Sequence, residues 1–308
     1  MKPITKPKAL KRGDVIGVCA PAGPAVDDED LRKGVRYLEG LGYRVVLSPH
    51  VLRRRGYLAG TDKQRASDLM GLFADPKVRA IIALRGGYGT QRILPLLDFP
   101  TIRRNPKIVV GYSDLTVLSL ALFAKTGLVT FAGPMVAAEM ARGLSGVAEE
   151  HFWRCLTSTK PLGRFPGPSG AFRKGTAEGR ILGGNLSLVA AMIGTPYCPS
   201  FEKSLVLLEE IGERPYRVDR MLQQMSLAGV WNASRGLILG TFIDCDPEPG
   251  KPSLSLHEVF EETFQHFPQP ILADLHHGHV RQSLTVPIGV RARIQNTRKL
   301  VILESAVT

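Results

Sequence analysis

The sequence is poor in cysteine, in aromatic residues and in long apolar runs, and each shortage excludes a class of protein. Its four cysteines are far apart and form no Cys-x-x-Cys pair, so neither a zinc site nor a redox motif is predicted. Aromatic residues make up 7% of the chain, and few of them interleave with basic residues as they do in nucleic-acid-binding modules. No apolar run reaches the roughly 18 residues of a membrane span, so no membrane partner is expected.

The cysteines and the N-terminus bear on the cellular compartment. Cys19 and Cys245 lie in apolar, strand-like runs and are expected to be buried thiols, which suits a reducing compartment. The chain has a basic start, but its apolar part at 15–20 is too short for a signal peptide and follows a Gly13-Asp14 interruption. A cytoplasmic location is therefore expected.

Acidic residues are outnumbered, with 28 Asp and Glu against 40 Lys and Arg and a formal net charge of +12. Basic stretches occur at 2–12 and 53–55. Such a balance favours an anionic partner, which could be nucleic acid, anionic lipid or an acidic small substrate. Because the other basic residues are scattered, a solvated surface is the preferred interpretation and no nucleic-acid partner is predicted.

The first half of the chain alternates strand-like and helix-like segments. Hydrophobic residues make up 44% of the sequence, as in globular proteins. Strands are predicted at 14–21, 44–48, 78–84, 107–112 and 129–133, and helices at 27–41, 61–73, 90–97 and 114–125. This alternation predicts an α/β domain with a parallel sheet of the flavodoxin-like or Rossmann-like kind, covered by helices on both faces.

The second half is richer in strand-like runs. A Gly- and Pro-rich stretch without periodicity, 163–175, is predicted to be a linker between domains 1–162 and 176–308. Strands are predicted at 178–184, 204–210, 235–244, 284–289, 290–296 and 299–305, and helices at 185–193, 216–228 and 256–266. The second domain is thus expected to be smaller, mixed and strand-rich.

Two loops follow predicted strands at the edge where sites form in parallel sheets. One is the glycine loop Arg85-Gly86-Gly87-Tyr88-Gly89, and the other is Gly111-Tyr112-Ser113-Asp114. The glycine loop matches neither the dinucleotide fingerprint nor a P-loop, so nucleotide binding is only an alternative. Acyl-transfer chemistry would instead use such amides as an oxyanion hole, from Asp114 and from Gly86 or Gly87.

Ser113 lies at the junction between a short apolar strand and an amphipathic helix. A serine at such a hinge has an exposed hydroxyl beside unpaired backbone N–H groups, as a nucleophile requires. Serine is also a preferred N-cap residue, and both interpretations fit this segment alone.

A serine nucleophile needs a base, and a cluster of three of the seven histidines stands out at 276, 277 and 279. It lies on a loop between two strand-like runs, whereas the other four lie in stretches that read as loop or surface helix. The cluster lacks the helical spacing and the nearby carboxylate of a metal site, so no metal is predicted. Glu209 and Glu210 end an apolar strand, and either could orient the base or simply mark the end of that strand.

An ordered set of segments carries a resemblance to a known family. They are RGGYG (85–89), GYSD-T (111–116), FAGPM (131–135), GGNL (183–186), IGTP (193–196), LLEEIGERPYRVDRML (207–222) and GH near VPIG (278–289). Together they resemble the LD-carboxypeptidase family of serine peptidases over most of the chain. The resemblance implies a parallel α/β domain, a strand-rich second domain, a site between them, a homodimer, and no metal or cofactor.

The resemblance also implies a function and a set of site residues. Its members use a Ser-Glu-His triad to remove the terminal D-alanine from murein tetrapeptides during cytoplasmic recycling of cell-wall peptides. Ser113 matches the nucleophile, Glu209 the triad acid with Glu210 beside it, and His279 the base. His276 and His277 receive no role. The α/β-hydrolase pattern G-x-S-x-G is absent, because Leu115 replaces the last glycine.

Arg85, adjacent to the proposed oxyanion residues Gly86 and Gly87, is the candidate for holding the substrate's terminal carboxylate. Three alternatives stay open at this point. Some members of the family hydrolyse peptide-nucleotide antibiotics and so confer immunity. The chain could also be a non-catalytic murein-peptide binder or a nucleotide-binding α/β protein.

Overall fold

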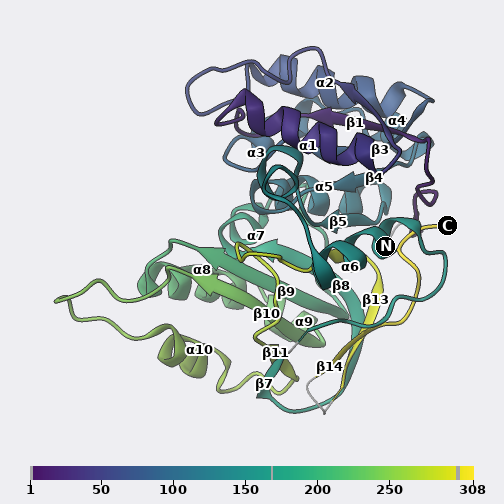
Figure 1. The fold of residues 1–308 in the computed structure, drawn as a ribbon. Helices are drawn as coiled ribbons and strands as arrows, with labels where there is room; N and C mark the ends of the chain where they lie inside the picture. The colour runs from purple at the N-terminus through teal and green to yellow at the C-terminus, as the bar shows by residue number, and fades with distance from the viewer. Residues whose placement is uncertain (1–2, 168, 296–298) are drawn as a thin grey trace.

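The structure is a computed structural model that describes residues 3–167, 169–295 and 299–308. It contains two sheets, one formed mainly by the first half of the chain and one by the second half (Figure 1). Lys2 of the basic N-terminal stretch and Asn296, the last residue of the predicted strand 290–296, lie outside the described residues.

The first sheet has six strands in the order β12-β5-β4-β3-β1-β2. All of its strands except β12 run parallel to their neighbours. Its parallel strands are β1 (Val15–Cys19), β2 (Arg44–Leu47), β3 (Val78–Ala83), β4 (Ile108–Val110) and β5 (Thr130–Ala132). They confirm the predicted parallel α/β half, because every predicted strand of this half is present.

The first two helices of this half begin within one residue of their predicted starts, at capping side chains. Thr61 and Gln64 form a capping box at the start of α2 (Asp62–Ala74), and the side chain of Asp27 caps α1 (Asp28–Gly40). The remaining helices are α3 (Thr90–Ile93), α4 (Phe99–Arg104), α5 (Thr116–Thr126) and α6 (Gly146–Thr157), with short helical turns at Leu94–Leu96, Ser113–Leu115 and Val136–Met140. The sequence predicts neither α4, which has only six residues, nor α6, whose buried face includes a histidine.

The second sheet has eight strands in the order β6-β14-β13-β8-β9-β10-β11-β7. Its centre is parallel and its two flanks are antiparallel. The strands are β6 (Gly163–Arg164), β7 (Gly170–Arg173), β8 (Ala177–Asn185), β9 (Ser204–Ile211), β10 (Gly236–Ile243), β11 (Ile271–Ala273), β13 (Arg291–Gln295) and β14 (Lys299–Ile302). Its helices are α7 (Leu186–Met192), α8 (Pro215–Leu227), α9 (Val230–Ala233) and α10 (Leu256–Phe264).

Two segments differ from the sequence prediction. The expected linker 163–175, apart from Pro168, which lies outside the described residues, contributes β6 and β7. Both are short edge strands within a Gly- and Pro-rich stretch that shows no alternating pattern. The run 284–289 forms β12 (Val286–Ile288), which crosses to the first sheet and pairs antiparallel with β5. Pro287 is tolerated there because β12 is an edge strand. The domain limits at 162 and 176 remain predictions.

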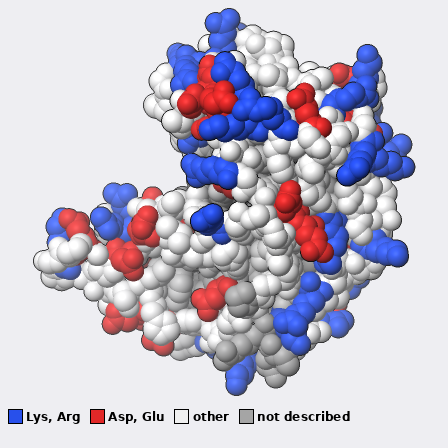
Figure 2. Space-filling view, in the orientation of Figure 1, with Lys and Arg blue, Asp and Glu red and all other residues white. Residues whose placement is uncertain are grey.

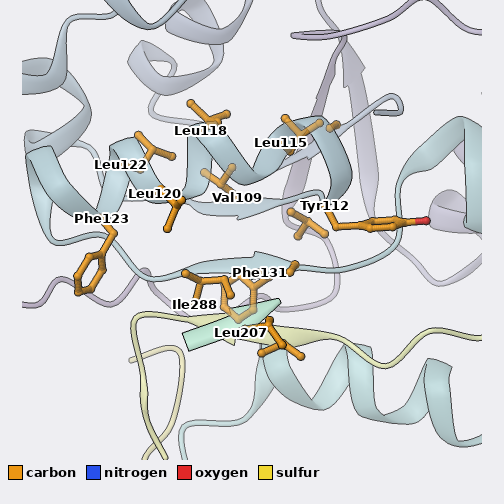
Figure 3. Close-up of a cluster of buried hydrophobic side chains, with 14 of the residues drawn as sticks. Val109, Tyr112, Leu115, Leu118, Leu120, Leu122, Phe123, Phe131, Leu207 and Ile288 are labelled. Atoms are coloured by element: carbon orange, nitrogen blue, oxygen red, sulfur yellow. The ribbon is translucent and has the colours of Figure 1, made fainter. Parts of the chain in front are cut away.

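The hydrophobic core is continuous between the two sheets (Figure 3). Helix α5 contributes Leu118 and Leu122 to it, while Phe131 of β5, Ile288 of β12 and Leu207 of β9 extend it toward the second sheet. All five side chains are buried. The two halves are therefore one packed body around the segment that carries Ser113.

The charged residues are distributed over the surface rather than gathered in one basic patch on the face shown in Figure 2, where acidic side chains lie among the basic ones. Several basic residues are engaged in ion pairs, as when Arg32 and Arg36 both contact Glu29 and Arg92 contacts Asp62. No helix in the described part of the chain combines the length and apolarity needed to cross a membrane.

Candidate active site

Ser113 occupies the sharp turn between β4 and α5. Its φ angle is 62°, in the left-handed region that is unfavourable for a residue with a side chain. Such backbone strain is concentrated at functional sites, and here it turns the side chain away from both elements. The hydroxyl does not cap the helix, because Tyr112 and Leu115 hold the cap positions of the two helical segments and Ser113 contacts a histidine instead. The N-cap interpretation is therefore wrong.

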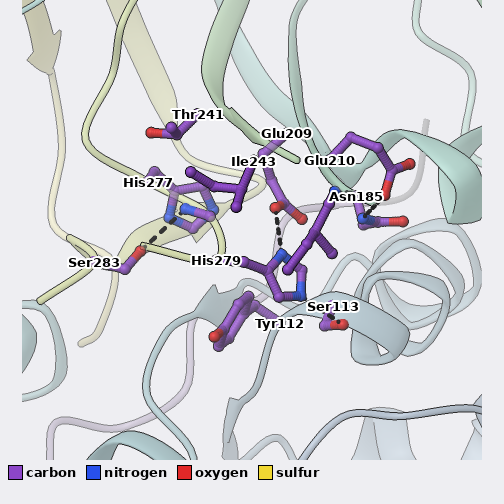
Figure 4. Close-up of polar contacts among 12 residues, drawn as sticks. Tyr112, Ser113, Asn185, Glu209, Glu210, Thr241, Ile243, His277, His279 and Ser283 are labelled. Carbon is purple, nitrogen blue, oxygen red and sulfur yellow. Dashed lines mark hydrogen bonds and ion pairs between the residues drawn. The ribbon is translucent and has the colours of Figure 1, made fainter. Parts of the chain in front are cut away.

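Three side chains from distant parts of the sequence form a hydrogen-bonded chain (Figure 4). The Ser113 hydroxyl lies 3.0 Å from Nε2 of His279, and Nδ1 of His279 lies 2.8 Å from Oε2 of Glu209. A carboxylate only accepts hydrogen bonds, so Nδ1 carries the proton and Nε2 is left to accept the serine O–H. This is the tautomer that a general base needs when it activates a hydroxyl.

The environment of His279 favours its charged form. Burial is the largest influence and opposes the imidazolium, but the hydrogen bond and the negative charge of Glu209 outweigh it. The charges of Glu210 and Glu139 act in the same direction, and the pKa of His279 lies above its usual value. Glu209 itself is only 1% exposed, so water screens this interaction little. The site can therefore stabilise an imidazolium that forms during a reaction.

Glu210 has a different set of partners from its neighbour. Its carboxylate accepts hydrogen bonds from the Asn185 side chain at 2.7 Å, the Ser187 amide at 2.8 Å and the Ile211 amide at 2.9 Å. Successive side chains of a strand point to opposite faces, so the two adjacent acids reach different surroundings. Glu210 holds the beginning of α7, whereas Glu209 faces His279.

The other two histidines of the cluster are directed elsewhere. Nε2 of His276 lies 3.0 Å from the carbonyl of Arg281, and Nδ1 of buried His277 lies 2.8 Å from the carbonyl of Leu284. Burial lowers the pKa of His277 and keeps it neutral. Within the described residues, no three His, Cys, Asp or Glu side chains converge as metal ligands would.

The glycine loop lies directly against the serine. A Cβ atom at Gly86 would be 3.2 Å from the Ser113 hydroxyl oxygen, closer than side chains normally pack, so a larger residue there would press on the Ser113 side chain. The amide of Thr90 donates to the buried carboxylate of Asp114 at 2.8 Å, and Arg65 donates to the Gly89 carbonyl at 2.8 Å. These bonds fix the loop beside the Ser113 turn, which places the backbone of Gly86 next to the serine oxygen.

A cavity of about 550 Å³ is lined in part by His279. Its walls include Tyr112 and Glu139, which are joined by a 2.7 Å hydrogen bond, and two arginines, Arg142 and Arg281. Burial and the Glu139 carboxylate raise the pKa of Tyr112, so its phenol stays protonated and donates this bond. Tyr112 lies in the Gly-Tyr-Ser-Asp motif, but no pattern in the sequence singles out the other three residues, which come from a short helical turn and a loop.

Arg85 does not line this cavity. Its guanidinium points back toward the N-terminal segment, where Nη1 lies 3.4 Å from the carbonyl of Pro24. Its expected contact with a substrate carboxylate therefore stays a prediction, outside the cavity that Arg142 and Arg281 line.

Two family models match the chain. Residues 16–133 match the LD-carboxypeptidase N-terminal domain, and residues 178–294 match the LD-carboxypeptidase C-terminal domain. The chain belongs to the LD-carboxypeptidase family. Family membership identifies it as a hydrolase of the carboxypeptidase type and confirms the resemblance seen in the sequence.

Individual relatives agree with this assignment. The chain is 38% identical to a probable murein peptide carboxypeptidase of Bacillus subtilis, over 98% of this chain and 95% of that protein. The structure of muramoyltetrapeptide carboxypeptidase from Oxalobacter formigenes matches with a TM-score of 0.84 and 31% identity, over 96% and 100% of the two chains. That of the microcin C7 self-immunity protein MccF matches with a TM-score of 0.91 and 26% identity, over 99% and 100%.

Proposed function

We propose that this LD-carboxypeptidase is a serine peptidase that releases the terminal D-alanine of murein tetrapeptides. The observation that carries the proposal is the chain of hydrogen bonds from Ser113 through His279 to Glu209, with distances of 3.0 and 2.8 Å. It supplies a nucleophile, a base and an orienting acid in the order that acyl transfer requires. Relatives named as murein peptide and muramoyltetrapeptide carboxypeptidases support the choice of substrate.

In the first step, the Ser113 oxygen attacks the carbonyl carbon of the scissile amide while Nε2 of His279 takes the hydroxyl proton. Glu209 keeps the proton on Nδ1 and stabilises the imidazolium. The tetrahedral intermediate collapses when the C–N bond breaks. His279 gives its proton to the departing amine, so D-alanine leaves and an acyl ester remains on Ser113.

In the second step, water replaces the leaving group. His279, neutral again, removes a proton from water as the water oxygen attacks the ester carbon. The ester bond to Ser113 breaks, and His279 returns its proton to the serine oxygen. The tripeptide acid leaves and the enzyme is restored, so no net proton remains on the protein.

The negative oxygen of both intermediates needs hydrogen-bond donors. The amide of Asp114 follows the nucleophile directly, and the amides of Gly86 and Gly87 belong to the loop against Ser113. We assign the oxyanion hole to the Asp114 amide together with one of these two glycine amides. Losing one donor of this kind typically lowers kcat by about 10²–10³-fold.

The remaining parts of the proposal rest on the family resemblance. We place the reaction in the cytoplasm, within the recycling of cell-wall peptides, and expect the enzyme to act as a homodimer without metal or cofactor. The net charge of +12 suits a substrate with several carboxylates.

The test is incubation of the protein with L-Ala-γ-D-Glu-L-Lys-D-Ala, followed by mass spectrometry of the products. The intact protein should release D-alanine, and Ser113→Ala should lower kcat by about 10⁴-fold or more, because the nucleophile is gone while its surroundings persist. Equal release of D-alanine by both proteins would show that another group carries out the reaction.

A second function is favoured by the similarity to MccF, whose solved structures include a complex with aspartyl sulfamoyl adenosine. The same triad could hydrolyse a peptide-nucleotide antibiotic. An assay with both substrate types separates the two functions. A higher kcat/KM for the peptide-nucleotide than for the tetrapeptide would favour the immunity function.

A further inference from the structure

Beside His279, the chain brings together two arginines that are far apart in sequence. Arg142 follows the helical turn Val136–Met140, and Arg281 lies two residues after His279 on the same loop. Both line the cavity of about 550 Å³ that His279 also lines. Residue Gln282 joins the two segments, because its side chain accepts from the Ser145 amide at 3.1 Å and donates to the Gly143 carbonyl at 3.2 Å.

The acid in the same wall, Glu139, forms no ion pair with either arginine. Glu139 is already engaged, since its two oxygens accept from the Tyr112 hydroxyl at 2.7 Å and from the Met135 amide at 2.9 Å. None of the ion pairs found among the described residues includes Arg142 or Arg281. The cavity therefore presents two guanidinium groups to whatever enters it.

The direction of proton transfer indicates which part of a substrate enters. His279 must protonate the leaving amine, so the leaving residue lies on the side of the imidazole. Because His279 lines the cavity, the leaving residue is expected to occupy it. The leaving residue of a carboxypeptidase carries a free carboxylate. Guanidinium groups match carboxylates in both charge and geometry, often through two parallel hydrogen bonds.

We propose that Arg142 and Arg281 bind the terminal carboxylate of the departing D-residue. This inference rests on the proposed function and adds the reason why the enzyme acts only at a chain end. An internal residue presents an amide in place of the carboxylate, so it leaves both guanidinium groups without an anion. The arginine pair thus selects exopeptidase over endopeptidase cleavage, and it does so from a cavity that Arg85 does not line.

The experiment compares two forms of L-Ala-γ-D-Glu-L-Lys-D-Ala, one with a free terminal carboxylate and one with a terminal carboxamide. The intact enzyme should prefer the acid by at least about 10-fold in kcat/KM, as for a hydrogen bond to a charged partner. Arg142→Gln and Arg281→Gln should each lower kcat/KM for the acid about 10-fold, mainly by raising KM, and leave the amide unaffected. The double variant should lose the preference, and Arg281→Lys should restore part of what Arg281→Gln loses.

Two controls keep the result interpretable. Arg103→Gln removes another exposed positive charge, from α4 and outside the cavity, and should keep the preference of the intact enzyme. Labelling of Ser113 by a serine-reactive phosphonate should proceed in every variant, which shows that the site still assembles.

An unchanged acid preference in the labelled double variant would overturn the inference. Loss of the preference in Arg85→Gln but not in the double variant would overturn it too and move the carboxylate to the glycine-loop side. In both outcomes the intact enzyme still turns over the tetrapeptide, so the proposed function survives. If the intact enzyme hydrolyses neither peptide, the proposed function fails and this inference falls with it.

Discussion

At the scale of single residues, Glu209 and Glu210 show how one position along a strand changes the chemistry of a side chain. Both acids are almost fully buried, at 1% and 2% exposure. Glu209 meets the imidazole of His279, while Glu210 binds the beginning of α7. Replacing each acid in turn by glutamine therefore separates an electrostatic effect on His279 from an effect on folding.

Glu209→Gln should shift the acid limb of the pH profile of kcat/KM to lower pH. In the intact enzyme the pKa of His279 is raised, so activity falls as the pH drops through a value above the usual 6.5. Without the Glu209 charge, burial dominates and lowers that pKa. The rate at the optimum should also fall about 10⁴-fold, because the histidine tautomer is no longer fixed.

The control for this prediction is Glu210→Gln, measured in the same pH series. It should shift the acid limb much less, because Glu210 acts on His279 only through its charge and makes no hydrogen bond to it. Its main effect should be a lower free energy of unfolding. Equal shifts in the two variants would contradict the distinct roles assigned to the two acids.

The three residues that the structure brings together, Ser113, His279 and Glu209, could be predicted from the sequence, because each lies in a local motif or at the end of a predicted strand. Their catalytic roles stay proposals. Arg142 and Arg281 could not be nominated in this way, since their proximity depends on a contact between loops 139 residues apart, through Gln282 and Gly143. Nothing in the local sequence encodes such a contact.

At the scale of elements, Asp114 connects the Ser113 turn to the glycine loop. Its carboxylate accepts the buried amide of Thr90, the first residue of α3. Asp114→Ala should lower the free energy of unfolding by about 1–3 kcal/mol, because that amide is left buried without a partner. It should also lower kcat, since the loop that carries Gly86 is no longer fixed. Urea denaturation and steady-state kinetics measure the two effects.

Asp114→Asn is the matched variant, because it keeps an acceptor oxygen for Thr90 and removes only the charge. It should retain most of the stability and activity that Asp114→Ala loses. If the two variants lose equal amounts of stability and activity, the charge of Asp114 accounts for the loss and its hydrogen bond to Thr90 does not.

The elements that could be predicted from the sequence are those with strong local signals. Strand β3 is a continuous apolar run, and α2 begins at a capping box. Strand β6 has no such signal, because it is only two residues long. The run 284–289 is predicted to be a strand, but its pairing with β5 as β12 is not predicted, because β5 lies far away in the chain. Their sheet membership follows from tertiary packing, which the local pattern does not contain.

At the scale of the whole molecule, His151 is a contact between the two halves. Its Nε2 lies 2.9 Å from the carbonyl of Thr285, next to β12, and its ring is almost completely buried. Burial, with a smaller effect of Arg154, lowers the pKa of His151 to about 4. The folded protein therefore keeps this imidazole neutral over a pH range in which the unfolded chain would protonate it.

The free energy of unfolding should decrease as the pH falls from 6.5 to about 4. In this window the unfolded state binds a proton that the folded state excludes, so acid favours unfolding. The contribution of His151 amounts to about 3 kcal/mol. His151→Gln keeps a donor for Thr285 but cannot be protonated, so its loss of stability between pH 7 and pH 4 should be smaller by this amount. Urea denaturation of both proteins at several pH values tests the prediction, and parallel curves would refute it.

The edge strand β12 has a consequence for synthesis on the ribosome. In the pairing of β5 with β12, Phe131 lies opposite Pro287. The first sheet is therefore incomplete until a segment more than 150 residues further along the chain has been translated. Until that segment emerges from the exit tunnel, one edge of the nascent sheet is open and the Phe131 side chain is uncovered. A ribosome that stalls in the second half of the message would thus hold a chain that displays an aggregation-prone edge, which makes this stage the natural point for a chaperone to bind.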